Sequence, residues 1–217
     1  MTLSVIITNY NYNQYLQEAI DSCEGADEVI VVDDCSDEAP VVTGWNKIFI
    51  NKKNIGLSAS RNRGISLATG DRIICLDADD KLDPAYIKAC KEDTTKDVLY
   101  GNYTNFGDDD GVTITPEFNG DALYGGNYIP CVACYKREQV YPMGVYRYDE
   151  DMKEGYEDWD FLIQMMKGGE TFRKIDVNMF YYRQHKGSMI HGTREKHNKL
   201  MNYIHNKYEE IPMVQSK

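Results

Sequence analysis

The chain lacks several features that mark well-known classes of protein. None of its segments approaches the roughly 20 consecutive apolar residues that a membrane-spanning helix needs, so we expect no integral membrane segment. The first residues, MTLSVIITNYN, show no basic stretch followed by a long apolar run, which argues against a secretory signal. Basic side chains are the minority, because 24 of them face 35 acidic ones and the net charge is −11. Nucleic acid is therefore not an expected partner.

Cysteines are few and scattered along the chain, and they suggest no disulfide framework. Cys131 and Cys134 form a lone CxxC pair, whereas zinc sites usually have a second pair and redox sites lie in a thioredoxin-like unit. A structural role is favoured for these two residues, and their function stays open. With reduced thiols and no secretory signal we expect a cytoplasmic protein. Peripheral association with the inner face of the membrane stays open.

Hydrophobic residues nevertheless make up 42% of the 217 residues, enough for a sizeable folded core. Asn13 is the predicted N-cap of a first helix, a second helix covers about 57–68 with Gly70 as its left-handed end, and Asp83 with Pro84 starts a third. Between these helices lie short β-branched runs, which are typical of strands buried on both faces of a parallel sheet. The runs are residues 3–8, 28–32, 47–50 and 72–76. This alternation predicts an α/β protein with a doubly wound sheet.

The pattern changes after about residue 98. Residues 97–106 and 112–115 flank a turn-like Asp-rich segment and predict a strand pair. Residues 120–135 stay unassigned, while 157–166 and 193–208 have helical patterns. We expect one domain over residues 1–217, with subdivisions at about 1–98, 99–190 and 191–217.

Polar residues follow three of the predicted strands, where ligands bind in open α/β sheets. Asp77 and Asp79 are the strongest pair, because two carboxylates so close repel unless a cation such as Mg²⁺ or Mn²⁺ offsets their charge. The alternative is that Asp79, Asp80 and Asp83 form a solvated turn and cap the next helix. Asp33 and Asp34 either start a turn, or one of their carboxylates accepts a hydrogen bond from a base N–H or a ribose hydroxyl.

Two further groups of polar residues lie in the second half of the chain. Glu157 and Asp158 start a helix, where the helix dipole favours acidic residues, and either could instead serve as a general base. Arg183 and Lys186 could neutralise a diphosphate, and His185 between them could bind a cation or a phosphate. An ordinary surface loop is the alternative for this last group.

The order of these motifs resembles the family 2 glycosyltransferases. The resemblance implies the GT-A fold: a Rossmann-like, mostly parallel central sheet flanked by helices, with a small mixed subregion on the acceptor side. It rests on SVIITNYN at 4–11, VVDDCS at 31–36, NIGLSASRNRG at 54–64, LDADD at 76–80, GYEDWD at 155–160 and YRQHKGS at 182–188.

The resemblance also implies a role for each matching residue. Residues 1–98 would form the half that binds the nucleotide sugar, and 99–190 the acceptor half with the catalytic residues. The residues expected to bind the nucleotide sugar are Thr8, Tyr10, Asp34, Arg61 and Asp77, with Asp34 on the base, commonly uracil.

The remaining implied roles concern the metal and the reaction. Asp79 would hold Mn²⁺ or Mg²⁺, with His185 as a further ligand of the metal or diphosphate. Asp158 would be the catalytic base beside Glu157. Contacts to the diphosphate or acceptor would come from Trp159, Arg183 and Lys186.

The implied function is an inverting, metal-dependent transfer of a sugar, commonly from a UDP-sugar, to a hydroxyl acceptor. The acceptor would be a glycan, a lipid-linked molecule or another hydroxyl compound, as in polysaccharide biosynthesis. A nucleotidyltransferase acting on sugar phosphates is an alternative, but it would need a Gly-rich basic loop, and residues 1–30 contain one Gly and no Lys or Arg. An inactive nucleotide-sugar-binding module is the other alternative, and the presence of Asp79, Asp158 and His185 together argues against it.

Overall fold

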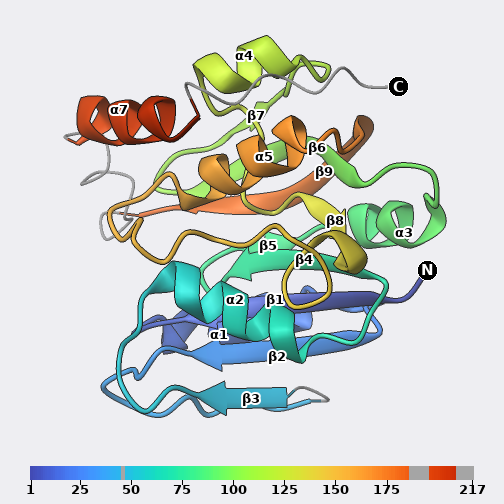
Figure 1. Cartoon of the computed structure of the whole chain (residues 1–217). Coiled ribbons are helices and arrows are strands. Elements are labelled where there is room, and N and C mark those ends of the chain that lie inside the picture. The colour runs from blue at the N-terminus through green and yellow to red at the C-terminus, as the bar shows by residue number, and fades with distance from the viewer. Residues whose placement is uncertain (45–46, 186–195, 209–217) are drawn as a thin grey trace.

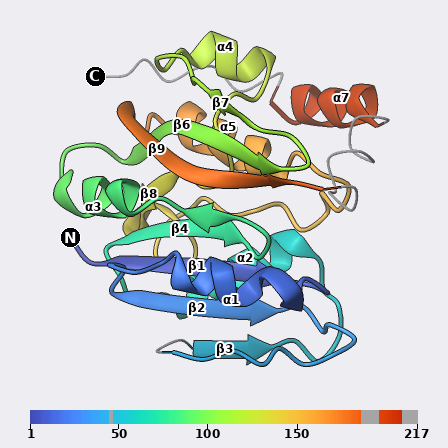
Figure 2. The same ribbon diagram turned by 180° about the vertical axis from the view of Figure 1, so that it is seen from behind.

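A computed structural model describes residues 1–44, 47–185 and 196–208 of the chain. Within that part, nine strands form one sheet, in which neighbours follow the order β3-β2-β1-β4-β8-β6-β9-β5 and β7 pairs with β6 (Figures 1 and 2). The strands are β1 (Leu3–Asn9), β2 (Glu28–Asp33), β3 (Lys47–Ile50), β4 (Arg72–Asp77), β5 (Lys81–Leu82), β6 (Val98–Gly107), β7 (Gly111–Thr113), β8 (Cys134–Lys136) and β9 (Phe172–Gln184).

Helices cover both faces of this sheet. The two views show α1 and α3 on one face, and α2 and α5 on the other, with α4 and α7 beyond the end that carries β6 and β9 (Figures 1 and 2). Their bounds are α1 (Asn13–Asp21), α2 (Leu57–Leu67), α3 (Pro84–Glu92), α4 (Gly120–Gly125), α5 (Glu157–Lys167) and α7 (His197–Tyr208). Within the described ranges, no helix has the length and apolar character to cross a membrane.

The parallel part of the sheet confirms the prediction from the apolar runs. Strands β1, β2, β3 and β4 are parallel, and every residue of β1 is buried. In this register Thr8 lies beside Asp77, and Asn9 lies beside Asp33. The polar residues that end these strands therefore meet at one edge of the sheet, as expected for parallel strands.

The second half of the sheet is mixed. The predicted pair of β6 and β7 is antiparallel and confirmed, and β8 runs antiparallel between β4 and β6. The longest strand is β9, with 13 residues, which pairs in parallel with β6. The sequence did not predict β9, and the unassigned stretch 120–135 contains α4 and the start of β8. The division of the chain near residue 98 stays a prediction.

Three helix ends were predicted, and one is confirmed. Asp83 caps α3, because its Oδ1 accepts a hydrogen bond from Ala85 N at 2.9 Å. Asn13 is the first residue of α1 rather than its cap, and its side chain donates to Glu38 O. Gly70 does not adopt the left-handed conformation, and α2 ends three residues before it, at Leu67. A Cβ at Gly70 would lie 2.7 Å from the backbone nitrogen of Ser4, so this glycine permits a close approach to β1.

Helix α2 lies close to β1 at Gly64, where a Cβ would lie 2.3 Å from Cγ2 of Ile6. Ile6 is fully buried and cannot move away freely. We expect Gly64→Ala to lower the free energy of unfolding by about 1–3 kcal/mol through overpacking, as measured by urea denaturation. Gly125→Ala at the end of α4 is the control, because a Cβ there meets no atom within 4 Å. An equal loss of stability in both variants would contradict this explanation.

Candidate active site

A cleft of about 630 Å³ opens at the carboxyl ends of the parallel strands, opposite the start of α5. Most of the predicted site residues line it, although they come from α2, from the start of α5, and from the ends of β1, β2 and β4 or the residues just after them. These lining residues are Thr8, Tyr10, Asp34, Arg61, Asp77, Asp79, Glu157 and Asp158. Distant motifs of the sequence are thus brought into one cavity.

The adjacent residues Asp33 and Asp34 have different surroundings. Asp33 forms the predicted turn, because its carboxylate accepts hydrogen bonds from the backbone N–H and the hydroxyl of Ser36. Asp34 is buried and holds the loop that precedes α2. Its Oδ1 accepts a hydrogen bond from Ile55 N and its Oδ2 accepts one from Gly56 N, each at 2.8 Å. Asp34 therefore sits on the cleft wall in a fixed orientation.

Arg61 joins the two sides of the cleft. Its side chain is 2% exposed, with Nη2 at 2.8 Å from Asp77 Oδ1 and Nη1 at 2.6 Å from Glu157 Oε1. Asp77 ends β4 and Glu157 starts α5, so one guanidinium bridges the parallel strands and the helix on the opposite side of the cleft. A buried cation of this kind is tolerated because both neighbours are carboxylates.

Asp158 is half-buried on the cleft wall, and two donors orient its carboxylate. Oδ1 accepts from Trp159 N at 2.7 Å, and Oδ2 accepts from the Asn127 side chain at 3.2 Å. Burial, together with the neighbouring charge of Glu157, raises the pKa of Asp158 to about 7, and Arg61 opposes this rise. A carboxylate with a pKa near neutrality is suited to act as a general base.

Asp79 lines the other side of the cleft and contacts His185, which is not among the lining residues. Asp79 Oδ2 lies 2.9 Å from His185 Nε2, and the rings of Tyr12 and Tyr15 pack against the imidazole at 5.5 and 5.7 Å. Burial and the nearby charge of Asp77 raise the pKa of Asp79. Among the described residues, no group of three or more His, Cys, Asp or Glu side chains is arranged to hold a metal ion.

Arg183, which was expected at a diphosphate, is not among the residues that line the cleft. Its backbone N–H donates to Asp80 Oδ1 at 2.8 Å, and its Nε donates to the backbone oxygen of Asp79 at 2.7 Å. The guanidinium lies between the rings of Tyr15 and Phe106 and pairs with Glu18. Arg183 therefore holds the turn that carries Asp79.

Two other expected contacts have different outcomes. Trp159 is buried in the core, where its Nε1 donates to Leu123 O at 2.6 Å and ties α5 to α4. The ring thus supports the cleft from behind rather than lining it. Lys186 lies outside the described residues.

The cleft also contains two residues to which the sequence assigned no role in this site. Asn127 donates to Asp158, and Cys131 Sγ lies 3.8 Å from Asp77 Oδ2. Both lie in the stretch that could not be assigned, and only Cys131 belongs to a recognisable motif, the CxxC pair. Cys131 and Cys134 are both free thiols, so the CxxC pair forms no disulfide.

Comparison with known families decides the classification. The sequence model of the protein family described as Glycosyl transferase family 2 matches residues 4–185. The chain belongs to glycosyltransferase family 2. The matched range includes the cleft, its Asp79–His185 pair and the start of α5.

Relatives of this glycosyltransferase include proteins of different lengths. The uncharacterized glycosyltransferase YwdF of Bacillus subtilis is 28% identical over 202 residues, which cover 83% of this chain and 74% of YwdF. Glycosyltransferase GlyA of Streptococcus pneumoniae is 27% identical over 124 residues, which cover 51% of this chain but 18% of GlyA. The match therefore spans less than a fifth of GlyA.

Solved structures share the GT-A fold of this glycosyltransferase. A crystal structure of S. aureus TarS has a TM-score of 0.74 at 20% identity, and the match covers 99% of this chain and 67% of that one. The mannosyltransferase PcManGT of Pyrobaculum calidifontis has a TM-score of 0.67 at 15% identity, with 97% and 65% covered. The predicted fold class is thus confirmed.

Removal of the Arg61 side chain should be strongly destabilising. We expect Arg61→Met to lower the free energy of unfolding by about 3 kcal/mol or more, because it leaves two facing carboxylates without their buried cation. Arg147→Met is the matched control, since Arg147 forms an exposed pair with Glu150 and should cost less than about 1 kcal/mol. Urea denaturation measures both, and similar small losses would show that the Arg61 bridge contributes little.

Proposed function

We propose that this glycosyltransferase moves a sugar from a nucleotide diphosphate donor, preferably a UDP-sugar, to an acceptor hydroxyl, with inversion at the anomeric carbon. The observation that carries the proposal is the arrangement of one cleft. It has Asp79, which contacts His185 behind it, on one side, Asp158 on the other, and Arg61 between the two. Structures of TarS with UDP-GlcNAc and of PcManGT with GDP-Man and Mn²⁺ support a nucleotide-sugar donor.

The donor base is proposed to bind at Asp34 and Tyr10. Each carboxylate oxygen can accept two hydrogen bonds, so Asp34 can accept a base N–H at Oδ2 while still holding Gly56. Tyr10 is 46% exposed and offers its ring for stacking on the base. We assign Thr8 and Asp77 to the ribose or the donor sugar, because Thr8 Oγ1 donates to Asp77 Oδ1 at 3.3 Å where β1 and β4 end beside each other in the cleft.

Asp79 and His185 would hold a divalent cation, Mn²⁺ or Mg²⁺. Carboxylate oxygen and imidazole nitrogen are both ligands of such ions, and substrate phosphates usually complete their coordination. This pair fits a divalent cation because Asp79 Oδ2 and His185 Nε2 already lie 2.9 Å apart. The nearby carboxylate of Asp77 adds a second negative charge that a cation would offset. When bound, the ion supplies positive charge that stabilises the diphosphate leaving group.

Asp158 is the proposed base. The acceptor oxygen forms a bond to the anomeric carbon while the bond to the diphosphate oxygen breaks, and the acceptor proton passes to Asp158. Trp159 N and Asn127 hold the carboxylate in position for this transfer. Glu157 is bound to Arg61, so we assign it a positioning role beside the base.

Two rival functions make different predictions. A nucleotidyltransferase would release pyrophosphate from a nucleoside triphosphate and a sugar phosphate, and family 2 membership argues against it. An inactive binding module would bind nucleotide sugars without cleaving them. The direct test is incubation with a panel of UDP-sugars and Mn²⁺ and measurement of UDP release, because slow hydrolysis excludes an inactive module and no release from any donor contradicts the proposal.

The proposed base predicts a pH dependence of transfer. The base must be deprotonated, so kcat/KM should rise about tenfold per pH unit below about 7 and level off above it. Asp158→Asn should abolish turnover but leave UDP binding near normal, because the base lies across the cleft from the nucleotide. Asp121→Asn, which changes an exposed residue of α4, is the control. Full activity of Asp158→Asn would show that another group is the base.

The proposed cation site predicts metal-dependent donor binding. In calorimetric titrations with UDP, Mn²⁺ should tighten binding to the unsubstituted chain. Asp79→Asn should remove most of this gain, because it removes a charged ligand. Asp109→Asn, at the exposed tip between β6 and β7, should behave like the unsubstituted chain. If Mn²⁺ enhances UDP binding equally in the Asp79 variant, the ion is held elsewhere.

A further inference from the structure

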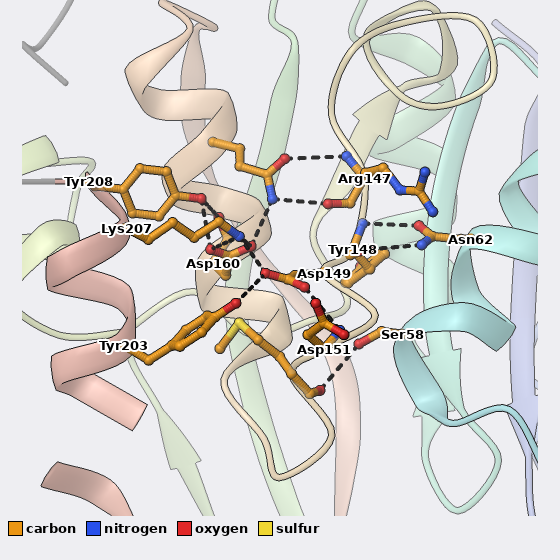
Figure 3. A network of polar contacts seen from close by, with 12 residues as sticks. Ser58, Asn62, Arg147, Tyr148, Asp149, Asp151, Asp160, Tyr203, Lys207 and Tyr208 are labelled. Carbon is orange, nitrogen blue, oxygen red and sulfur yellow. Dashed lines mark hydrogen bonds and ion pairs between the residues drawn. The ribbon is translucent and has the colours of Figure 1, made fainter. Parts of the chain in front are cut away.

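Asp160 is an acidic residue of the α5 first turn that the proposed reaction does not use. It lies two residues after Asp158 and is fully buried. Its Oδ1 accepts a hydrogen bond from the Tyr208 hydroxyl at 2.7 Å and lies 2.9 Å from Lys207 Nζ, while Oδ2 accepts from Gln164 (Figure 3). Both Lys207 and Tyr208 belong to the last turn of α7. A buried carboxylate on α5 thus depends on a cation from a distant helix.

The same lysine reaches a second segment. Lys207 Nζ lies 2.6 Å from Asp149 Oδ2, which also accepts from the Tyr203 hydroxyl at 3.0 Å (Figure 3). The next residue before Asp149, Tyr148, exchanges two backbone hydrogen bonds with the Asn62 side chain, at 2.8 and 2.9 Å. Asn62 follows Arg61 on α2. The end of α7 is therefore linked to both helices that carry the Arg61–Glu157 ion pair.

The first turn of α7 holds the segment that leads into α5. His197 Nδ1 lies 2.6 Å from the Tyr156 hydroxyl, and Lys199 pairs with Glu154 at 2.7 Å. Tyr156 lines the cleft and precedes α5 in the left-handed conformation, with φ of 64°. Both ends of α7 thus contact the chain on either side of Asp158.

We propose that α7 is a positioning element for the catalytic base, with Lys207 and Tyr208 holding Asp160 so that the start of α5 keeps Asp158 in reach of the acceptor hydroxyl. This inference rests on the proposed function. Separation of the buried Asp160 carboxylate from its cation and hydrogen bonds is energetically costly. A shift of α5 away from α7 would separate them, so the bound α7 holds α5 in place. A base acts only within hydrogen-bond reach of the proton it takes.

The donor side should depend on this contact much less than the start of α5 does, because α7 is linked to it, among the described residues, only through Asp149, Tyr148 and Asn62. Thr8, Asp34 and Asp79 stand at the ends of β1, β2 and β4, and none of the hydrogen bonds and ion pairs just described reaches them. Loosening of α7 should therefore lower the rate of the chemical step while nucleotide binding stays intact. A residue needed only for folding would affect both properties together.

The test compares Lys207→Met and Tyr208→Phe with Lys88→Met, which removes a 75% exposed lysine of α3. The donor is the UDP-sugar that the unsubstituted chain hydrolyses fastest among UDP-glucose, UDP-galactose and UDP-N-acetylglucosamine with Mn²⁺. The quantities to be measured are kcat from UDP release, the Kd of UDP by calorimetry, and the Tm.

A small misplacement of a catalytic group lowers the rate by up to about 100-fold. We therefore expect kcat to fall roughly 10- to 100-fold in Lys207→Met and about 3- to 10-fold in Tyr208→Phe. The Kd of UDP should stay within about twofold of the unsubstituted value in both, and Lys88→Met should change neither quantity, because the donor side is not misplaced.

Two results would overturn the inference. One is unchanged kcat in both variants of α7, and the other is a parallel loss of kcat and UDP affinity, which indicates a purely structural role. If Lys207→Met does not fold, Tyr208→Phe decides, because it removes only one hydroxyl group. Absence of UDP release from the unsubstituted chain would instead count against the proposed function, so the two failures are distinguishable.

Discussion

A single buried guanidinium sets the geometry of the cleft. Arg61 can stay charged in the interior only because Asp77 and Glu157 lie on either side of it, and the Glu157 carboxylate could not be buried there without the arginine. Asp77 is two residues from Asp79, and Glu157 is next to Asp158. The ion pair therefore fixes the separation between the proposed cation site and the proposed base, although these groups are far apart in the sequence.

The first half of the fold and the central site residues could be predicted from the sequence. Strands buried on both faces leave apolar runs that are easy to recognise, and parallel strands end at a common edge. Asp34, Asp77 and Asp79 follow such runs, so their meeting was expected. Strand β9 was missed although Ile175, Val177 and Met179 alternate with polar residues, a period-two pattern typical of a strand. Helix α4 has six residues, too few for a helical period to show.

The individual roles of charged residues were harder to predict, because residue type shows what a side chain can bind but not which partner it meets. Arg183 was expected at a diphosphate, yet it contacts Glu18 and the Asp79 backbone, more than 100 residues away along the chain. Asp160 gave no signal beyond its place in a helix start, and its partners come from α7, 47 and 48 residues further on. Such long-range pairs arise from the fold as a whole.

The central claim is that Asp158 alone serves as the reacting carboxylate, because Glu157 is held by Arg61, and that one direct displacement follows. The anomeric configuration of the first product tests this claim most directly. Hydrolysis of an α-linked UDP-sugar with Mn²⁺ can be followed by proton NMR before the free sugar equilibrates, with water as the acceptor. The account predicts that the β anomer forms first. Initial release of the α anomer would contradict a single displacement and would require a different arrangement of catalytic groups.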